Sequence, residues 1–209
     1  MKPMITLYHC ADARSLRPLW ALEELGLDYE LKLLPFPPRV FAKEYLAINP
    51  LGTIPFFVDG DAKMTESSGI CAYLVQKYGP TLLAIAPDET DYAAYLNWLF
   101  FSDATLTFPQ TIVLRYTRLE PEERRLPQAV EDYGKWFLGR LRAVEAALAD
   151  RAYLVGDRFT IADICIAYAL HLAESLPPLR ENITPNARAY LERLRQRPAF
   201  VRAQERQKG

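Results

Sequence analysis

The stretch Asn49–Phe57, with the sequence NPLGTIPFF, decides how this chain is interpreted. It predicts a loop that runs into a short apolar strand, followed by a hairpin turn at Asp59–Gly60. Proline is normally excluded from a paired strand because it has no N–H to donate. Since Pro55 stands where the apolar strand begins, we expect either an edge residue or a cis proline that turns the backbone.

An acid and two hydroxyl side chains follow at the start of the next helix, in the run Glu66-Ser67-Ser68. Free amides and a hydroxyl at a helix N-terminus receive a carboxylate, and an acidic side chain there can receive an ammonium. Together with a backbone amide beside a special proline, this pattern suits a small zwitterionic peptide.

The first 80 residues mix short strands with helices. Residues 5–8 and 29–33 alternate in polarity as strands do, and residues 14–25 between them are helical in composition, with Gly26 as the stop signal. This is a βαβ unit, whose two strands should be parallel. The hairpin strands are expected at residues 54–58 and 63–65, and the helix after them at residues 67–78. The order is thioredoxin-like.

After Pro87 the pattern becomes entirely helical. Helices are expected at residues 91–106, 130–149, 161–172 and 186–197, with breaks at Pro109, Pro121, Pro127, Gly156, Pro177-Pro178 and Pro185. The sequence therefore predicts an α/β plus all-α protein. A thioredoxin-like domain at residues 1–80 precedes an all-helical domain at residues 88–209.

One local signal in the helical part is structural. Thr160 and Asp163 have the spacing of an N-terminal capping box, flanked by Phe159 and Ile164 as a hydrophobic staple. Its loss should cost about 1 kcal/mol or more.

The bulk properties indicate an ordinary globular protein. The net charge is −1, and the start lacks the apolar run of a signal peptide. No stretch is long and apolar enough to span a bilayer, so we expect a cytoplasmic protein that binds neither membrane nor nucleic acid. The three cysteines fit reduced thiols, and with two histidines they have no metal-ligand spacing. The basic residues from Arg188 to Lys208 are expected to form a solvated helical face with a frayed tail.

With these pieces placed, the chain resembles the cytosolic glutathione S-transferase superfamily, most closely its bacterial and fungal theta-like members. The matching segments occur in the same order and spacing: Ser15-Leu16-Arg17, residues 20–27, Asn49–Gly52 leading to Ile54-Pro55, Glu66-Ser67, and residues 156–163. The resemblance implies a homodimer that conjugates glutathione, its co-substrate, to small hydrophobic electrophiles.

The resemblance assigns binding roles to four residues of the first domain. Ile54, before Pro55, is expected to present its N–H and C=O to the cysteinyl part of glutathione. Glu66 and Ser67 match the pair that binds the γ-glutamyl end. The alternatives are that Pro55 only ends a strand and that Ser67 is only a helix cap.

Three further residues concern the outer parts of the ligand. Asp103 matches an acid that reaches the γ-glutamyl group of the neighbouring subunit, unless it is simply a solvated helical acid. Many relatives carry Lys or Gln where this chain has Thr53, so the contact with the glycyl carboxylate is weaker or displaced. Arg39 is the candidate replacement for that contact, unless it is simply an exposed, solvated arginine.

The group that activates the sulfur does not follow from the resemblance. Serine-type relatives place their hydroxyl at the position of Ala13, and the cysteine of beta-class enzymes falls near Arg14. The remaining candidates, in order, are Ser15, Cys10 and Tyr8, with Arg14 or a backbone amide as alternatives. Each of these three also has a structural interpretation: Ser15 as a helix cap, Cys10 as a small buried thiol and Tyr8 as a packing aromatic.

Other functions stay open at this point. An apolar electrophile pocket is expected between the domains, with Phe108, Tyr116 and Trp20 as candidate lining residues. Cys10 could instead support thiol–disulfide exchange on glutathionylated substrates. Because the usual sulfur donor is missing, a non-catalytic carrier of glutathione or of a hydrophobic ligand is the third hypothesis.

Overall fold

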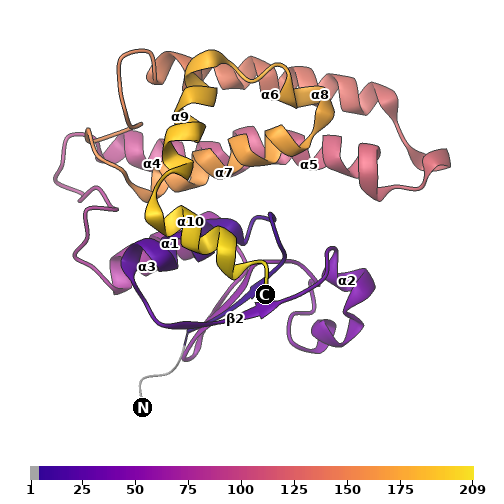
Figure 1. Ribbon diagram of the computed structural model, residues 1–209, viewed down its shortest axis with the longest axis horizontal. Coiled ribbons are helices and arrows are strands. Elements are labelled where there is room, and N and C mark those ends of the chain that lie inside the picture. Colours follow the sequence, from indigo (N-terminus) through magenta and orange to yellow (C-terminus); the bar gives the residue numbers. More distant parts are fainter. Residues whose placement is uncertain (1–4) are drawn as a thin grey trace. The chain divides into compact units, whose positions relative to one another are not determined.

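The structure is a computed structural model and describes residues 5–209. The chain divides into two compact units, one formed by the segment up to Ala84 together with Arg195–Gly209 and the other by Ile85–Leu194. Figure 1 shows the path of the chain through both.

The first unit is built on a four-stranded mixed sheet. The strands are β1 (Ile5–His9), β2 (Tyr29–Leu33), β3 (Phe56–Asp59) and β4 (Ala62–Met64), in the order β2-β1-β3-β4. β1 and β2 are parallel, whereas β3 is antiparallel to both β1 and β4. The hairpin between β3 and β4 turns at Gly60, whose φ of 61° lies in the left-handed region that glycine tolerates. The predicted thioredoxin-like topology is confirmed.

Two helices, α1 (Leu16–Leu25) and α3 (Ser67–Lys77), lie against the sheet (Figure 1). α1 ends as predicted at Gly26, which has a φ of 62° and donates its N–H to the Leu22 carbonyl. Two short helices, α2 (Pro38–Phe41) and the 3-10 helix η1 (Lys43–Ala47), interrupt the long connection from β2 to β3. They place Ala42 and Tyr45 in a small core with Phe56, against which Tyr8 packs.

The end of the chain is an ordered helix, α10 (Pro198–Arg206), which packs on α1. The rings of Trp20 and Phe200 meet edge to face, with centroids 4.8 Å apart. Arg197 forms an ion pair with Glu24, and Arg202 forms one with Glu23. The expectation of a solvated face and a frayed tail is therefore wrong, because these arginines have acidic partners on α1.

A helix is present at each of the four positions predicted after Pro87, and the first continues beyond its predicted end. The elements of the helical unit are α4 (Tyr92–Phe100), the π-helix η2 (Phe101–Thr107), α5 (Phe108–Leu114), the π-helix η3 (Arg115–Leu119), the 3-10 helix η4 (Glu122–Arg124), α6 (Pro127–Ala147), α7 (Ile161–Ser175), α8 (Pro177–Arg180) and α9 (Pro185–Arg195). The helical path continues through Pro109, where a break was predicted. The Phe108 N–H donates to the Asp103 carbonyl, five residues back, so a widened turn precedes the proline and accommodates its missing N–H.

α7 is the central helix of this unit, with most of its side chains buried. The predicted capping box at its start is present. The Thr160 hydroxyl accepts from the Ala162 N–H, and the Thr160 N–H donates to the Asp163 carboxylate. Among residues 5–209, no helix is both long and apolar enough to cross a lipid bilayer.

Candidate functional site

Three segments of the first unit that carry predicted site residues meet in the structure. Tyr8 of β1 lies opposite Phe56 of β3, so the end of β1 is level with Ile54 and Pro55. The guanidinium of Arg17, which is completely buried, donates to the Ser67 hydroxyl at 2.9 Å. The start of α1 is thereby tied to the start of α3.

The loop before β3 is held by two side chains to which the sequence analysis assigned no role. The Thr53 carbonyl accepts from the Tyr45 hydroxyl at 2.8 Å and from the side-chain amide of Asn49 at 2.9 Å. Asn49 is itself buried, and its Oδ1 accepts from the Leu51 N–H. An asparagine directly before Pro-x-Gly is a known signal for such an Asx turn.

This support orients the next peptide group, that of Ile54. The Ile54–Pro55 peptide bond is cis, as are Phe36–Pro37 and Gly79–Pro80. Within residues 5–209, the N–H and C=O of Ile54 take part in no hydrogen bond. An unpaired main-chain unit at the end of a strand is the kind of edge to which an extended peptide can be added.

The N-terminus of α3 combines an exposed acid with a buried hydroxyl. Glu66 is the N-cap residue with extended backbone, and its carboxylate accepts only weakly from the neighbouring Thr65 hydroxyl, at 3.4 Å. Ser67 is buried, and because its oxygen accepts from Arg17, the hydroxyl hydrogen can be donated to a further group.

The candidates for the glycyl carboxylate belong to the first unit, whereas the candidate for the γ-glutamyl group of a neighbouring subunit belongs to the helical unit. Arg39 and Thr53 are both exposed and flank Gly52, where an added Cβ would come within 2.7 Å of the Arg39 Cβ. Arg39 is therefore beside the same loop as Thr53. Asp103 is half-buried on η2 in the helical unit.

Ser15, the first candidate for activating the sulfur, is engaged with its own loop. Its side chain is completely buried, and its hydroxyl oxygen accepts from the Cys10 N–H at 3.3 Å. The Cys10 carbonyl lies 3.5 Å from the same hydroxyl and can accept its hydrogen. A hydroxyl held this way stabilises the turn and is poorly placed to donate to a ligand.

The thiol of Cys10 is also buried, 3.6 Å from the Pro35 carbonyl. Burial raises its pKa to about 12. Since the thiolate is the reactive form, such a thiol is a weak nucleophile at neutral pH.

The third candidate, Tyr8, packs against aromatic rings. Its ring centroid is 5.5 Å from that of Tyr45 and 5.8 Å from that of Phe56. Successive side chains of a strand point to opposite faces, so Tyr8 faces away from the buried side chains of Leu7 and His9.

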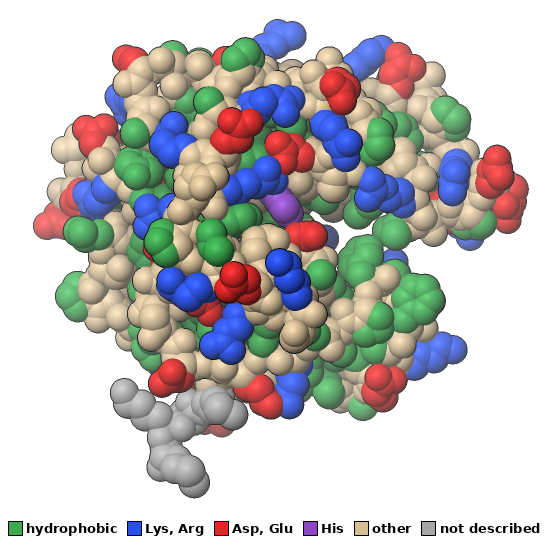
Figure 2. All heavy atoms as spheres, in the orientation of Figure 1, with side chains coloured by type: hydrophobic (Ala, Val, Ile, Leu, Met, Phe, Trp, Pro, Cys, Tyr) green, Lys and Arg blue, Asp and Glu red, His purple; other side chains and the backbone are tan. Residues whose placement is uncertain are grey.

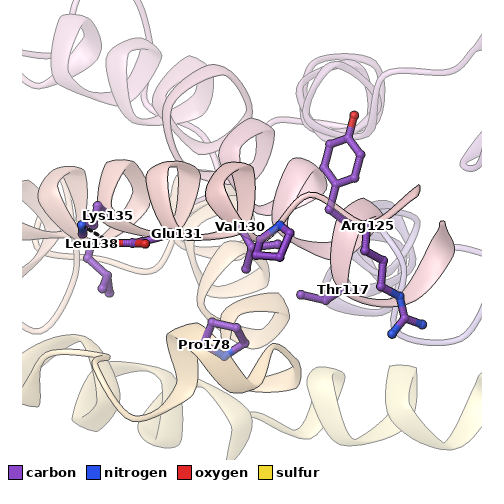
Figure 3. A pocket seen from close by; sticks show the side chains of 10 residues that line it. Thr117, Arg125, Val130, Glu131, Lys135, Leu138 and Pro178 are labelled. Carbon is purple, nitrogen blue, oxygen red and sulfur yellow. Dashed lines mark hydrogen bonds and ion pairs between the residues drawn. The ribbon is translucent and has the colours of Figure 1, made fainter. Parts of the chain in front are cut away.

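The expected electrophile-pocket residues are divided between the two units. Trp20 belongs to the core of the first unit, where its indole N–H donates to Glu24. Tyr116 lines a hollow of about 580 Å³ within the helical unit, formed by residues of η3, the first half of α6 and Pro178 (Figure 3). Phe108 is exposed and packs on Tyr133. In the part of the chain that the structure describes, no group of three or more His, Cys, Asp or Glu is placed to hold a metal ion.

The comparisons with known proteins agree on one family. Residues 7–82 match the family model "Glutathione S-transferase, N-terminal domain" and residues 116–198 match "Glutathione S-transferase, C-terminal domain". The chain is 32% identical over 215 residues to Glutathione S-transferase 2 of Schizosaccharomyces pombe, covering 93% of this chain and 92% of that protein. It is 31% identical over 188 residues to Glutathione S-transferase 3 of Zea mays, with coverage of 86% and 83%.

Solved structures show the same likeness over the whole fold. The glutathione transferase URE2P6 from Phanerochaete chrysosporium, in complex with oxidized glutathione, is 28% identical with a TM-score of 0.84. The comparison covers 99% of this chain and 97% of that one. A glutathione S-transferase from Actinobacillus pleuropneumoniae is 27% identical with a TM-score of 0.82, covering 99% and 94%.

Proposed function

The chain belongs to the cytosolic glutathione S-transferase superfamily, and we propose that it conjugates the thiol of glutathione to small hydrophobic electrophiles. The proposal is carried by two features of the first unit: the Ile54 peptide group, which has no hydrogen-bond partner in the described part of the chain, and the available acid and hydroxyl at the start of α3. These groups match the peptide, ammonium and carboxylate groups of one extended tripeptide.

In the proposed complex, the cysteinyl part of glutathione pairs with the N–H and C=O of Ile54. The γ-glutamyl carboxylate accepts from the Ser67 hydroxyl and the first amides of α3, and its ammonium binds the exposed Glu66. Arg39, beside Thr53, supplies the cation for the glycyl carboxylate.

This placement puts the sulfur near the loop between β1 and α1. The thiol of free glutathione titrates near pH 8.5, as a cysteine does, so a nearby positive group is needed to hold the thiolate at neutral pH. Because Ser15 and Cys10 are buried, we assign that role to the exposed Arg14 guanidinium and to main-chain amides at the start of α1. With an aryl halide, the thiolate forms a C–S bond, the carbon–halogen bond breaks, and halide leaves. The thiol proton passes to solvent.

The test combines binding with turnover. Calorimetry with glutathione should show binding, and the rate of conjugation with 1-chloro-2,4-dinitrobenzene should exceed that of free glutathione. Glu66→Gln and Ser67→Ala should each weaken binding about tenfold, the effect of one charge-assisted hydrogen bond. Glu44→Gln, at an exposed acid on η1, is the matched control. Absence of heat and of accelerated turnover would refute the proposal.

A homodimer and a cytoplasmic location are part of the proposal. Among residues 5–209, half of the exposed large apolar side chains lie in the segment from β2 to the loop before β3: Leu33, Phe36, Val40, Phe41, Leu46, Ile48 and Leu51. Figure 2 shows hydrophobic side chains gathered over the α2 region. Patches of this kind mark protein interfaces. Asp103 of a second copy would complete the site, and light scattering at micromolar concentration tests for the dimer. The three cysteines are thiols and not disulfides, which fits a reducing compartment.

The burial of Ser15 and Cys10 also favours a second function, a non-catalytic glutathione carrier. A carrier would bind glutathione through the same groups but would not accelerate conjugation. Calorimetry and the conjugation rate distinguish the two functions, because only an enzyme would both bind glutathione and accelerate conjugation.

A further inference from the structure

The side chain of Gln207, the residue that follows α10, bonds to the loop between β1 and α1. Its Oε1 lies 3.0 Å from His9 Nε2 and accepts from the Asp12 N–H at 3.1 Å. Its Nε2 donates to Asp12 Oδ1 at 2.9 Å and to Gln204 Oε1 at 3.0 Å. A carboxamide has two donors and two acceptor sites, so every one is used: two on Asp12 of this loop, one on His9 at the end of β1 and one on Gln204 of α10.

These bonds fix the orientation of the Gln207 amide. Its oxygen must face the Asp12 N–H and its nitrogen must face the Asp12 carboxylate. His9 Nε2, on the oxygen side, must therefore be the donor. Burial lowers the pKa of His9, which keeps the ring neutral with its hydrogen on Nε2.

Asp12 is the residue that needs such support. Its φ of 54° lies in the left-handed region, which a non-glycine residue adopts at some cost. Gln207 bonds both the main-chain N–H and the side chain of Asp12, so it holds this residue on two sides. The next residues are Ala13 and Arg14, and the direction of their peptide groups depends on the turn at Asp12.

The C-terminal helix that carries Gln207 is itself fixed to α1. Glu23, nearly buried, accepts from Arg202 Nε at 2.8 Å and from the Tyr29 hydroxyl. Arg197 binds Glu24 through two hydrogen bonds, and Phe200 packs on Trp20. The position of Gln207 is thus set by α1, the helix whose N-terminus the loop leads into.

We propose that Gln207 is a positioning residue for the loop between β1 and α1, which lies near the sulfur in the proposed complex. By holding Asp12, it directs the Arg14 side chain and the neighbouring main-chain amides toward the glutathione thiol. This inference rests on the proposed function. It adds a contribution from the end of the chain, 195 residues away from Asp12 in sequence. Gln207 itself touches neither glutathione nor the electrophile.

The experiment compares Gln207→Ala with Arg206→Ala, each in the full-length protein. Arg206 is the neighbouring residue and contacts Glu23 at 3.6 Å, so this control disturbs α10 without touching the loop. Gln207→Ala should lower kcat about 10- to 100-fold, the usual effect of misplacing a reacting group by about 1 Å, with little change in the KM for glutathione. The ultraviolet absorbance of the bound thiolate at fixed pH should fall in parallel. The Arg206→Ala control should keep both the kcat and the thiolate absorbance of the unchanged protein.

A double variant provides the rescue. In Gln207→Glu the new carboxylate repels Asp12, and kcat should fall as in Gln207→Ala. Adding Asp12→Asn exchanges donor and acceptor, because the new amide at position 12 donates to the new carboxylate at position 207. Kcat and thiolate absorbance should then recover at least tenfold. A merely structural role for Gln207 would move the unfolding midpoint without this recovery.

Three results would overturn the proposal, and a fourth would separate its failure from that of the proposed function. It is wrong if Gln207→Ala turns over like the unchanged protein, or if the double variant does not recover. Hydrogen exchange of the Asp12 amide, which needs no activity, should quicken in Gln207→Ala, and an unchanged rate likewise overturns it. If the unchanged protein showed no turnover, the proposed function would fail as well, and that failure is visible before any variant is made.

Discussion

The carboxylate of Asp163 is the group whose removal should destabilise the helical unit most. It is completely buried and accepts four hydrogen bonds. Oδ1 accepts from the Leu154 N–H at 3.1 Å and from the Tyr190 hydroxyl at 2.8 Å. Oδ2 accepts from the Thr160 N–H at 2.8 Å and lies 3.1 Å from the Thr160 hydroxyl. The side chain thus joins the start of α7 to α9 and to the loop before α7.

Asp163→Asn keeps the shape but cannot satisfy these partners. Its NH2 group would replace one carboxylate oxygen and face a main-chain N–H in either orientation, that of Leu154 or that of Thr160. A main-chain N–H cannot rotate away, so one hydrogen bond to a charged acceptor is lost and one buried donor is left unpaired. These effects cost about 1.5–3 and 1–3 kcal/mol respectively, which sums to roughly 2.5–6 kcal/mol. That is a large part of the ~5–15 kcal/mol by which domains are stable.

The measurement is urea unfolding of the full-length protein followed by far-ultraviolet circular dichroism. Thr160→Ala is the matched control, since it removes only the capping hydroxyl and should cost about 1 kcal/mol. If Asp163→Asn were no more destabilising than Thr160→Ala, the argument from unsatisfied donors would be wrong.

The remaining predictions concern the first unit. Because the pKa of Cys10 is raised to about 12, its thiolate fraction below pH 8 should be about a thousandfold smaller than that of a free cysteine. Alkylation by iodoacetamide, followed by mass spectrometry, should be correspondingly slow and should rise with pH up to about 12; labelling at the rate of a free cysteine would contradict the burial of the thiol. Arg17→Met leaves the Ser67 hydroxyl without its buried donor, so we expect a loss of roughly 2–3 kcal/mol in urea unfolding and weaker glutathione binding by calorimetry. Unchanged binding would show that the bond from Arg17 does not orient Ser67. Asn49→Asp replaces the donor to the Thr53 carbonyl by a repelling oxygen and should weaken glutathione binding about tenfold. Equal calorimetric affinity would mean that the loop keeps its shape without this contact.

Much of the fold follows from local patterns. Alternating polarity in residues 5–8 and 29–33, the turn at Asp59–Gly60 and the stop at Gly26 each act within a few residues, and each agrees with the structure. The capping box at Thr160 is of the same kind, because both partners lie within one turn. The loop before β3 could be placed from the sequence because its Pro and Gly residues restrict the backbone themselves.

The misplaced features depend on contacts between distant segments. A proline breaks a helix in most contexts, but Pro109 is accommodated by a π turn whose side chains pack against α7. The sequence predicts a solvated basic tail because the acidic partners of Arg197 and Arg202, which are Glu24 and Glu23, lie far away in the sequence. Sequence patterns of helices and strands relate residues a few positions apart, so they cannot predict that the C-terminal arginines pair with α1.

The sequence by itself determined which residue types could hold a tripeptide, because the Ile54–Pro55 and Glu66–Ser67 motifs are contiguous and their chemistry is local. Only the tertiary structure decided which groups of the loop between β1 and α1 are accessible. Ser15 is buried, burial raises the pKa of Cys10, and packing of α10 brings Gln207 to Asp12. Exposure and long-range hydrogen bonding are properties of the folded chain as a whole, so no local pattern encodes them.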